Sequence, residues 1–134
     1  YCPYIIGPGD HPDDFQFIHV FWYPNRGPVS EHINVIEPIM QKINPSIWLR
    51  IKANLRLKTN HVRVGGMHTD VGNYGHTTSI FYVNSNDGCT TFENGDTYKS
   101  VENRLITFPS HLRHAGSSPS NTKTRFVINF NYFQ

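Results

Sequence analysis

The residues of this sequence with the most evident chemistry are His68 and Asp70, which are separated by one residue. In an extended strand, side chains at positions i and i+2 project from the same face, so this spacing places an imidazole beside a carboxylate. A second histidine from a neighbouring strand would complete a set of two histidines and one carboxylate. Such a set leaves half of an octahedral ion's positions open, as in non-haem iron(II) centres.

The spacing alone is not selective, because the composition permits chance matches. Eight histidines and six aspartates in 134 residues give about 0.4 His-x-Asp triplets by chance. A second triplet, His11-Pro12-Asp13, lies among prolines and glycines that favour a turn, where no strand can hold the geometry. His68 and Asp70 are better placed, because they follow the strand-like segment 62–64 and two glycines that indicate a bulge or a close backbone approach.

The composition favours a single β-rich domain, residues 1–134. Nine Phe, seven Tyr and two Trp accompany frequent Ile, Val and Thr. The net charge of +2 does not indicate nucleic acid as a partner. Cys2 and Cys89 form no disulfide framework, so we expect a reducing compartment and a cytoplasmic protein. There is no apolar run of about eighteen residues and no signal-peptide pattern, so we expect no membrane segment.

The N-terminal third is predicted to place one strand before a helical segment. Residues 1–14 are expected to be irregular, and 15–23 to form a strand that ends in a Pro-Asn-Arg-Gly-Pro turn. Ser30 is a candidate N-cap, and apolar residues then recur at helical spacing as far as residue 43. Pro38 falls inside this pattern and should kink the helix or split it in two. We therefore expect one or two helices packed on a sheet.

The segment 46–58 has the clearest alternation in the chain. One face is apolar and is predicted to pack in the core: Ile47, Leu49, Ile51, Ala53, Leu55 and Leu57. The other face carries mainly polar side chains: Trp48, Arg50, Lys52, Asn54, Arg56 and Lys58. Two interpretations of this second face stay open. It is either a solvated strand face, or a surface on which Asn54 and Arg56 line a pocket for an anionic ligand.

Short strands are predicted in the second half of the chain, at 77–84, 90–93, 105–108 and 125–132. Their connections are rich in Asn, Gly, Ser and Pro, which are turn-forming residues. Many short strands after one early helical segment favour a mainly β fold. We predict an antiparallel, cupin-like jelly roll (a double-stranded β-helix) whose core spans about residues 46–134.

Several of these segments together resemble the 2-oxoglutarate/iron(II) dioxygenases, specifically their prolyl-4-hydroxylase-like branch. His68-Thr69-Asp70 resembles the family's His-x-Asp, and Thr-Ser-Ile-Phe-Tyr-Val-Asn at 78–84 resembles the strand after it. Gly-Cys-Thr-Thr-Phe at 88–92 is similar to the Gly-Gly-x-Thr-x-Phe hairpin. Residues 104–110 with His114, and then 125–130, resemble the strands that carry the distal histidine and the basic residue. The order and spacing match over roughly 46–134, which is more specific than any single motif.

The resemblance implies a metal centre with a cosubstrate pocket, of the small stand-alone kind common in bacteria and their phages. His68, Asp70 and His114 would be the catalytic iron(II) ligands, leaving room for a bidentate 2-oxoacid and O2. Arg125 would bind the remote carboxylate of 2-oxoglutarate, because arginine binds carboxylates bidentately. The Tyr82 hydroxyl would add a second donor. The implied reaction hydroxylates an unidentified substrate, a peptidyl prolyl or other side chain being favoured, and releases succinate and CO2.

One position departs from the family pattern, and several assignments have competitors. The slot that often holds a cosubstrate-binding tyrosine contains Arg56, so Arg56 or Asn54 takes over that contact, or the oxoacid is held differently. His111 competes with His114, and Lys123 with Arg125. Tyr82 has a simpler interpretation as a buried aromatic. The remaining strand-borne or loop histidines are interpreted as structural: His19, His32, His61 and His76.

Two functions of other classes are also compatible with the sequence. A cupin-like metalloprotein with non-oxygenase chemistry would keep the three metal ligands but would gain nothing from Arg125. A non-enzymatic jelly-roll binding module would need neither the metal ligands nor Arg125. The oxygenase interpretation is preferred because it alone accounts for the whole His-Asp-His-Arg series.

Overall fold

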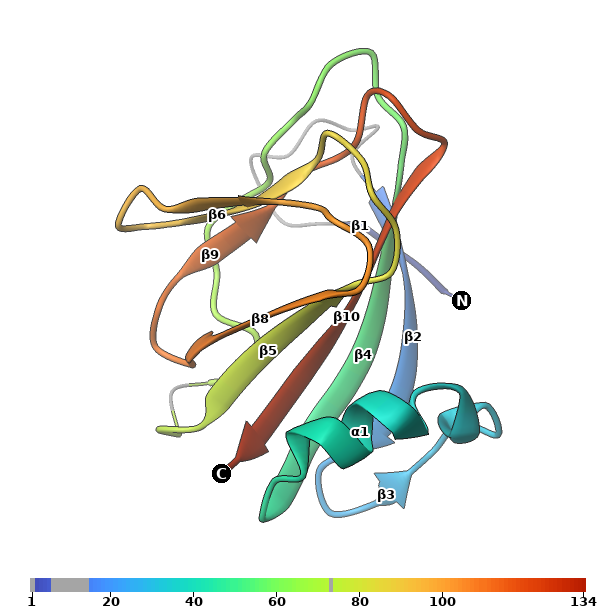
Figure 1. Cartoon of the computed structure of the whole chain (residues 1–134), viewed down its shortest axis with the longest axis vertical. Coiled ribbons are helices and arrows are strands. Elements are labelled where there is room, and N and C mark those ends of the chain that lie inside the picture. Colours follow the sequence, from blue (N-terminus) through green and yellow to red (C-terminus); the bar gives the residue numbers. More distant parts are fainter. Residues whose placement is uncertain (1, 6–14, 73) are drawn as a thin grey trace.

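The structure, a computed structural model, describes residues 2–5, 15–72 and 74–134. Two antiparallel sheets make up the fold (Figure 1). The larger sheet has the order β1 (Cys2–Ile5), β2 (Phe15–Tyr23), β4 (Ile47–Leu57), β10 (Thr124–Phe133), β5 (Thr77–Tyr82) and β8 (Arg104–Pro109), and β3 (Gly27–Pro28) pairs with β2. The smaller sheet has the order β7 (Thr97–Lys99), β6 (Cys89–Phe92) and β9 (His114–Gly116). This architecture confirms the predicted jelly roll.

Strands β4 and β10 form the centre of the larger sheet, and their register decides which side chains share a face. Phe130 lies opposite Ile51, and Asn129 lies opposite Lys52. Directly opposed residues of an antiparallel pair project from the same side. The sheet therefore has an apolar outer face and, at β4 and β10, a strongly polar inner face.

Two short helices cover the outer face: a 3-10 helix η1 (Ile33–Val35) and an α-helix α1 (Glu37–Ile43). Pro38 lies in the first turn of α1, where its missing N–H costs no helical hydrogen bond, so it splits the helical segment as predicted. Ile36 is buried between the two helices and joins the outer core with Ile51 and Phe130. The helices thus cover the apolar face, as predicted from the apolar spacing.

Ser30 does not cap either helix, so that prediction was wrong. The N-cap residues are His32 and Ile36, and neither makes a side-chain capping bond. The Ser30 hydroxyl instead lies 2.8 Å from His19 Nε2 and accepts a hydrogen bond from the His32 backbone N–H. A tertiary contact with β2 has replaced the expected local cap.

The inner face of the larger sheet is covered by the smaller sheet rather than by water. Asn54 is 8% exposed and Arg56 5% exposed, so the interpretation of a solvated strand face was wrong. A second apolar cluster lies on this side, with Phe92 from the smaller sheet among residues of the larger one: Ile80, Tyr82, Phe108 and Val127. In the middle of β4 the alternation therefore separates two interiors and not a core from solvent. At its ends Ile47 and Leu57 are exposed, so their predicted place in the core was wrong.

Other differences concern short segments. Residues 2–5 form β1 on the edge of the larger sheet, whereas residues 1–14 were expected to be irregular. The strand-like segment 62–64 makes only one isolated bridge, Val64 to Ser117. Strands β3, β7 and β9 were not predicted. The triplet His11-Pro12-Asp13 lies outside the described residues.

Within the described ranges, no helix has the length and apolar character to cross a membrane.

Candidate metal centre and cosubstrate pocket

His68 and His114 come from distant parts of the chain, and their backbones pair directly. His68 N donates to the His114 carbonyl at 2.9 Å, and His114 N donates to the His68 carbonyl at 2.9 Å. Such a reciprocal pair places the two residues directly opposite each other, as in an antiparallel ladder. Their imidazole centroids are 4.9 Å apart. Backbone geometry alone therefore brings the two rings together.

Asp70 completes the cluster, which we name the triad: His68, Asp70 and His114. Asp70 Oδ1 lies 3.8 Å from His68 Nε2 and 4.0 Å from His114 Nε2, and the three ligand atoms all lie within 4.8 Å of one another. The other ring nitrogens face carbonyl oxygens, His68 Nδ1 at 3.0 Å from Gly66 O and His114 Nδ1 at 3.5 Å from Leu112 O. With Nδ1–H donating to these carbonyls, each Nε2 presents a lone pair to the centre of the triad.

This donor set fits a divalent first-row transition ion. Ligand atoms about 2.0–2.2 Å from an ion lie about 3 Å from one another, so the two distances from Asp70 to the histidines would shorten by about 1 Å around a metal. Two imidazoles and one carboxylate on one side of an ion match iron(II) with open positions. The structure brings together the three residues predicted from the sequence, and their role as ligands stays a prediction.

Asp70 is held as a buried carboxylate by the inner face of the larger sheet. Its Oδ2 accepts hydrogen bonds from Asn129 Nδ2 at 2.8 Å and Asn131 Nδ2 at 3.4 Å. Burial alone would raise the pKa of Asp70, but the positive charges around it, led by His114 and Arg50, outweigh burial and lower that pKa. Burial lowers the pKa of His114, with Asp70 opposing it. Both groups therefore favour the protonation states that bind a metal ion.

Arg125 is buried in a hydrogen-bonded cluster between the sheets. Its Nε donates to Ser100 Oγ at 2.7 Å, and one terminal nitrogen donates to Thr90 Oγ1 at 2.9 Å. The Tyr82 hydroxyl donates to the same Thr90 oxygen at 2.8 Å, and the Arg125 guanidinium carbon lies 5.6 Å from the Tyr82 ring centroid. Burial lowers the pKa of Arg125 to about 10, which still leaves it charged at neutral pH. Arg125 and Tyr82 thus both contact Thr90, and the cosubstrate-binding role that the resemblance implies for them stays a prediction.

Gly116 connects this cluster to the triad. It lies two residues after His114 on β9, so the two residues face the same side of the strand. A Cβ on Gly116 would be 3.1 Å from Arg125 Nη1, so the guanidinium occupies the space that a side chain would take. Two residues of strand span about 6–7 Å, which is close to the length of a five-carbon dicarboxylate.

Comparisons with known proteins support the fold. No protein-family model matches the sequence, and no curated protein matches it. A solved oxidoreductase of the 2OG-Fe(II) oxygenase family from Burkholderia pseudomallei aligns with a TM-score of 0.67, at 12% identity, over 98% of this chain and 73% of that chain. At this identity the likeness concerns the jelly-roll fold.

Two further solved structures align more weakly. A cupin domain from Bordetella pertussis Tohama I has a TM-score of 0.47 at 10% identity, over 63% of this chain and 81% of that chain. An HTH_3 family transcriptional regulator from Vibrio cholerae has a TM-score of 0.45 at 15% identity, over 63% of this chain. The alignment spans 43% of that regulator, less than half of its length.

Asn54 and Arg56 both face the interior, but they differ in what they contact. One Arg56 terminal nitrogen donates to the Gly116 carbonyl at 2.6 Å, so Arg56 lies beside the position at which Arg125 meets β9. Asn54 Oδ1 is buried and has no hydrogen-bond partner among the described residues. The interpretation that they line a pocket agrees with their burial, and which of them contacts a cosubstrate stays a prediction.

The competing candidates His111 and Lys123 differ in burial from the residues that were preferred. His111 is exposed, whereas His114 is buried. Lys123 is also exposed, whereas Arg125, two residues later, is buried. His76 is buried, with no hydrogen-bond partner for either ring nitrogen among the described residues, and its ring packs 6.3 Å from the Phe133 ring. The structure therefore groups His114, and not His111, with His68 and Asp70, and it buries Arg125 but not Lys123.

Sequence reasoning missed the residues that position the site. Thr90 was part of the hairpin motif, and its hydroxyl now accepts from both Tyr82 and Arg125. Asn129 and Asn131, which orient Asp70, carry an i, i+2 spacing on a predicted strand that could have identified them as neighbours on one face. Ser100 gave no signal, because it lies outside any predicted element.

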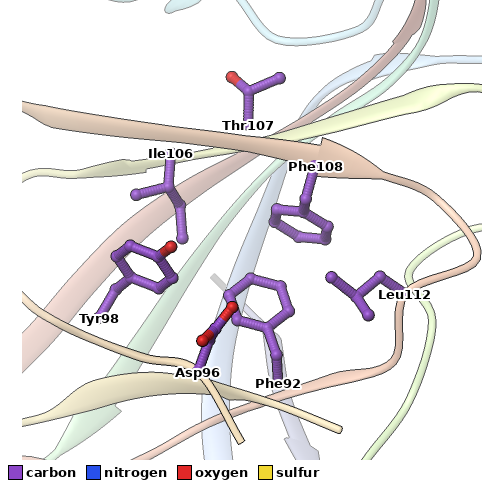
Figure 2. Close-up of a pocket in the computed structure, with 7 residues that line it drawn as sticks. All are labelled: Phe92, Asp96, Tyr98, Ile106, Thr107, Phe108 and Leu112. Atoms are coloured by element: carbon purple, nitrogen blue, oxygen red, sulfur yellow. The ribbon is translucent and has the colours of Figure 1, made fainter. Parts of the chain in front are cut away.

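A separate pocket of about 240 Å³ opens between β6, β7 and β8 (Figure 2). It is lined mainly by apolar side chains: Phe92, Asp96, Tyr98, Ile106, Thr107, Phe108 and Leu112. The rings of Phe92 and Phe108 also pack on the His114 ring, with centroids 6.0 and 4.9 Å away. These rings therefore stand between the pocket and the triad and help to fix the imidazole.

Proposed function

We propose that this protein is a 2-oxoglutarate-dependent iron(II) oxygenase that hydroxylates an organic substrate and releases succinate and CO2. One observation carries the proposal: the Arg125 guanidinium lies against Gly116 of β9. Gly116 is two residues after His114, and both residues face the same side of the strand. The triad and the guanidinium are thus about as far apart as the two ends of 2-oxoglutarate. A fold shared with a solved 2OG-Fe(II) oxygenase family protein is consistent with this assignment.

Different residues would bind the two ends of the cosubstrate, the triad through the metal ion and Arg125 at the remote carboxylate. His68 and His114 would hold iron(II) through Nε2 and Asp70 through Oδ1, each oriented by a second hydrogen bond. When bound, iron supplies the activation of dioxygen coupled to decarboxylation of the 2-oxoacid. Arg125 would pair with the remote carboxylate, a charge-assisted contact in a buried setting.

Tyr82 and Thr90 lie beside Arg125, at the end of the pocket that would bind the remote carboxylate. Burial raises the pKa of Tyr82, so its hydroxyl keeps its proton and remains a donor at neutral pH. Thr90 Oγ1 accepts from both Tyr82 and Arg125, which leaves its own hydroxyl proton available for an acceptor. A cosubstrate carboxylate is such an acceptor. Peptidyl prolyl or other side chains remain the favoured substrates, on the resemblance alone.

The test is an anaerobic titration with iron(II) followed by 2-oxoglutarate. We expect the weak visible charge-transfer band of a chelated iron–2-oxoacid complex, and succinate formation once air is admitted. Arg125→Gln should weaken 2-oxoglutarate binding about 10–100-fold, because it removes a charge-assisted hydrogen bond. Lys123→Gln, which removes an exposed cation just before β10, is the matched control and should change nothing. Iron binding without the band, or an Arg125→Gln variant with normal affinity, would contradict the proposal.

A further inference from the structure

Two cations of β4, Arg50 and Lys52, stand beside the triad and have no role in the proposed reaction so far. They lie opposite Asn131 and Asn129, the two amides that hold Asp70. Opposed residues share a face, so both cations point toward the triad. An Arg50 terminal nitrogen is 3.6 Å from Asp70 Oδ1.

The hydrogen-bonding capacity of Arg50 is largely unused. Its Nε and one terminal nitrogen, the Nη2 atom that lies 3.6 Å from Asp70 Oδ1, are buried, and neither makes a hydrogen bond with the described residues. The amide oxygens of Asn129 and Asn131 also have no partner there, so they do not satisfy the guanidinium. Buried donors of a charged group are costly to leave unpaired. An acceptor that the described residues do not supply therefore belongs at this position.

The local charge leads to the same conclusion. The oxygen of Asp70 that faces Arg50 is Oδ1, which also faces both histidine Nε2 atoms. A metal ion on Oδ1 takes up that negative charge. A dianionic cosubstrate then balances the divalent ion. The single charge of Asp70 stands against the four cations of this inner face, Arg50, Lys52, Arg56 and Arg125, so the face keeps a net positive charge. Burial lowers the pKa of Lys52, with Arg50 adding to this effect and Asp70 opposing it.

We propose that Arg50 and Lys52 bind an oxyanion, a carboxylate or a phosphate, on the substrate that is hydroxylated at the triad. This inference rests on the proposed function and narrows its substrate class to acidic molecules or acidic side chains. The triad is exposed to solvent at His68, whose side chain is 51% exposed, and the Arg50 side chain is 18% exposed. Arginine and lysine together suit such a group, since the guanidinium fork and the ammonium both donate to anionic oxygens.

The test measures whether small oxyanions bind next to the metal. Manganese(II) replaces iron, 2-oxoglutarate is kept saturating, and inorganic phosphate or carbon-13-labelled acetate is titrated in. The paramagnetic relaxation of the phosphorus or carbon nucleus reports binding close to the ion. We expect saturable relaxation enhancement in the wild type, and apparent affinity about tenfold or more lower in Arg50→Gln and Lys52→Gln. The stronger of the two probes distinguishes phosphate from carboxylate as the substrate group.

Conservative and exposed variants separate binding from folding. Arg50→Lys keeps the charge and should retain part of the enhancement, and the exposed Lys123→Gln should retain all of it. Thermal unfolding of each variant verifies that it is folded. The 2-oxoglutarate affinity is measured on the same samples by the charge-transfer band with iron(II).

Each other result counts against the inference. No saturable enhancement in wild-type protein that binds 2-oxoglutarate overturns it and leaves the proposed function intact. Loss of 2-oxoglutarate affinity in Arg50→Gln or Lys52→Gln, equal to that in Arg125→Gln, also overturns it, because the two cations would then serve the cosubstrate. Absence of 2-oxoglutarate binding to the wild type overturns the proposed function, and the inference with it.

Discussion

Asn129 donates a 2.8 Å hydrogen bond to Asp70 Oδ2, the carboxylate oxygen that does not face the two histidines. This bond fixes the carboxylate so that Oδ1 points toward the histidine Nε2 atoms. Partners of this kind commonly change metal affinity by about 10–100-fold when they are removed. The geometry of the candidate metal centre therefore depends on Asn129, which contacts Asp70 and is not itself one of the proposed ligands.

We expect Asn129→Ser to weaken metal binding by about tenfold or more, because Asp70 loses its shorter amide partner. Asn131→Ser is the comparison, since its bond to Asp70 is longer, at 3.4 Å, and it also donates to Thr78 Oγ1 at 3.1 Å. Asn131→Ser should therefore lower the free energy of unfolding, and it should weaken metal binding less than Asn129→Ser does. Cobalt(II) titration and chemical denaturation of both variants measure the two quantities. Equal metal affinity in Asn129→Ser and wild type would contradict the prediction.

His114→Ala should abolish tight metal binding, because it removes one of the three proposed ligands and a buried ring that packs on Phe108. His111→Ala should bind metal as the wild type does, since His111 is exposed and lies outside the triad. Isothermal titration with iron(II) or cobalt(II) compares the pair. If His111→Ala is the variant that loses the ion, the assignment of the distal ligand is wrong.

Gly116→Ala should reduce 2-oxoglutarate affinity about tenfold while it leaves metal affinity unchanged. The added Cβ would lie 3.1 Å from Arg125 Nη1, and the guanidinium is fixed by Ser100 and Thr90, so it cannot move freely. Gly66→Ala is the matched control, because its Cβ would meet nothing within 4 Å. Separate titrations of metal and of 2-oxoglutarate measure the effect. A parallel loss of both affinities would indicate general damage to β9 and would refute this specific role.

Ile51→Ala should lower the free energy of unfolding by about 2–5 kcal/mol, because its side chain is fully buried in the outer core. Ile47→Ala, on the same strand and 57% exposed, should change it by less than about 0.5 kcal/mol. Chemical denaturation measures both. Folded Ile51→Ala should keep its metal affinity, because its side chain faces away from the triad. Similar losses in the two variants would contradict the burial of Ile51 in the outer core.

Strong local signals predicted the parts of this fold that depend on sequence period. The strand 15–23 and the strand in 46–58 were predicted from apolar runs and alternation, and they correspond to β2 and β4. Pro38 divided the helical segment, since its constraint is local. Strand β9 has three residues and pairs through His114 with a loop residue. No periodicity can arise in so short a strand, which explains why it was missed.

The candidate site also has residues that could be predicted from the sequence and residues that could not. His68, Asp70 and His114 could be predicted because their residue types limit what they can do, and the structure brings them together. Whether the polar face of β4 meets water depended on the second sheet, which the local pattern of 46–58 does not encode. The contacts of Ser100 with Arg125 and of Asn129 with Asp70 likewise depend on strand order. Serine and asparagine occur in too many settings for their type to identify such a role.

The backbone bridge between His68 and His114 also bears on how the chain holds together. The connection from β4 to β5 carries His68 and Asp70, and it is joined to β9 there by two hydrogen bonds. An ion on the triad would add a reversible cross-link between segments far apart in the sequence. Because such an ion binds only the folded chain, a free concentration 100 times its dissociation constant would add about 2.7 kcal/mol to the free energy of unfolding. Metal supply would then set the melting temperature of this protein as well as its activity.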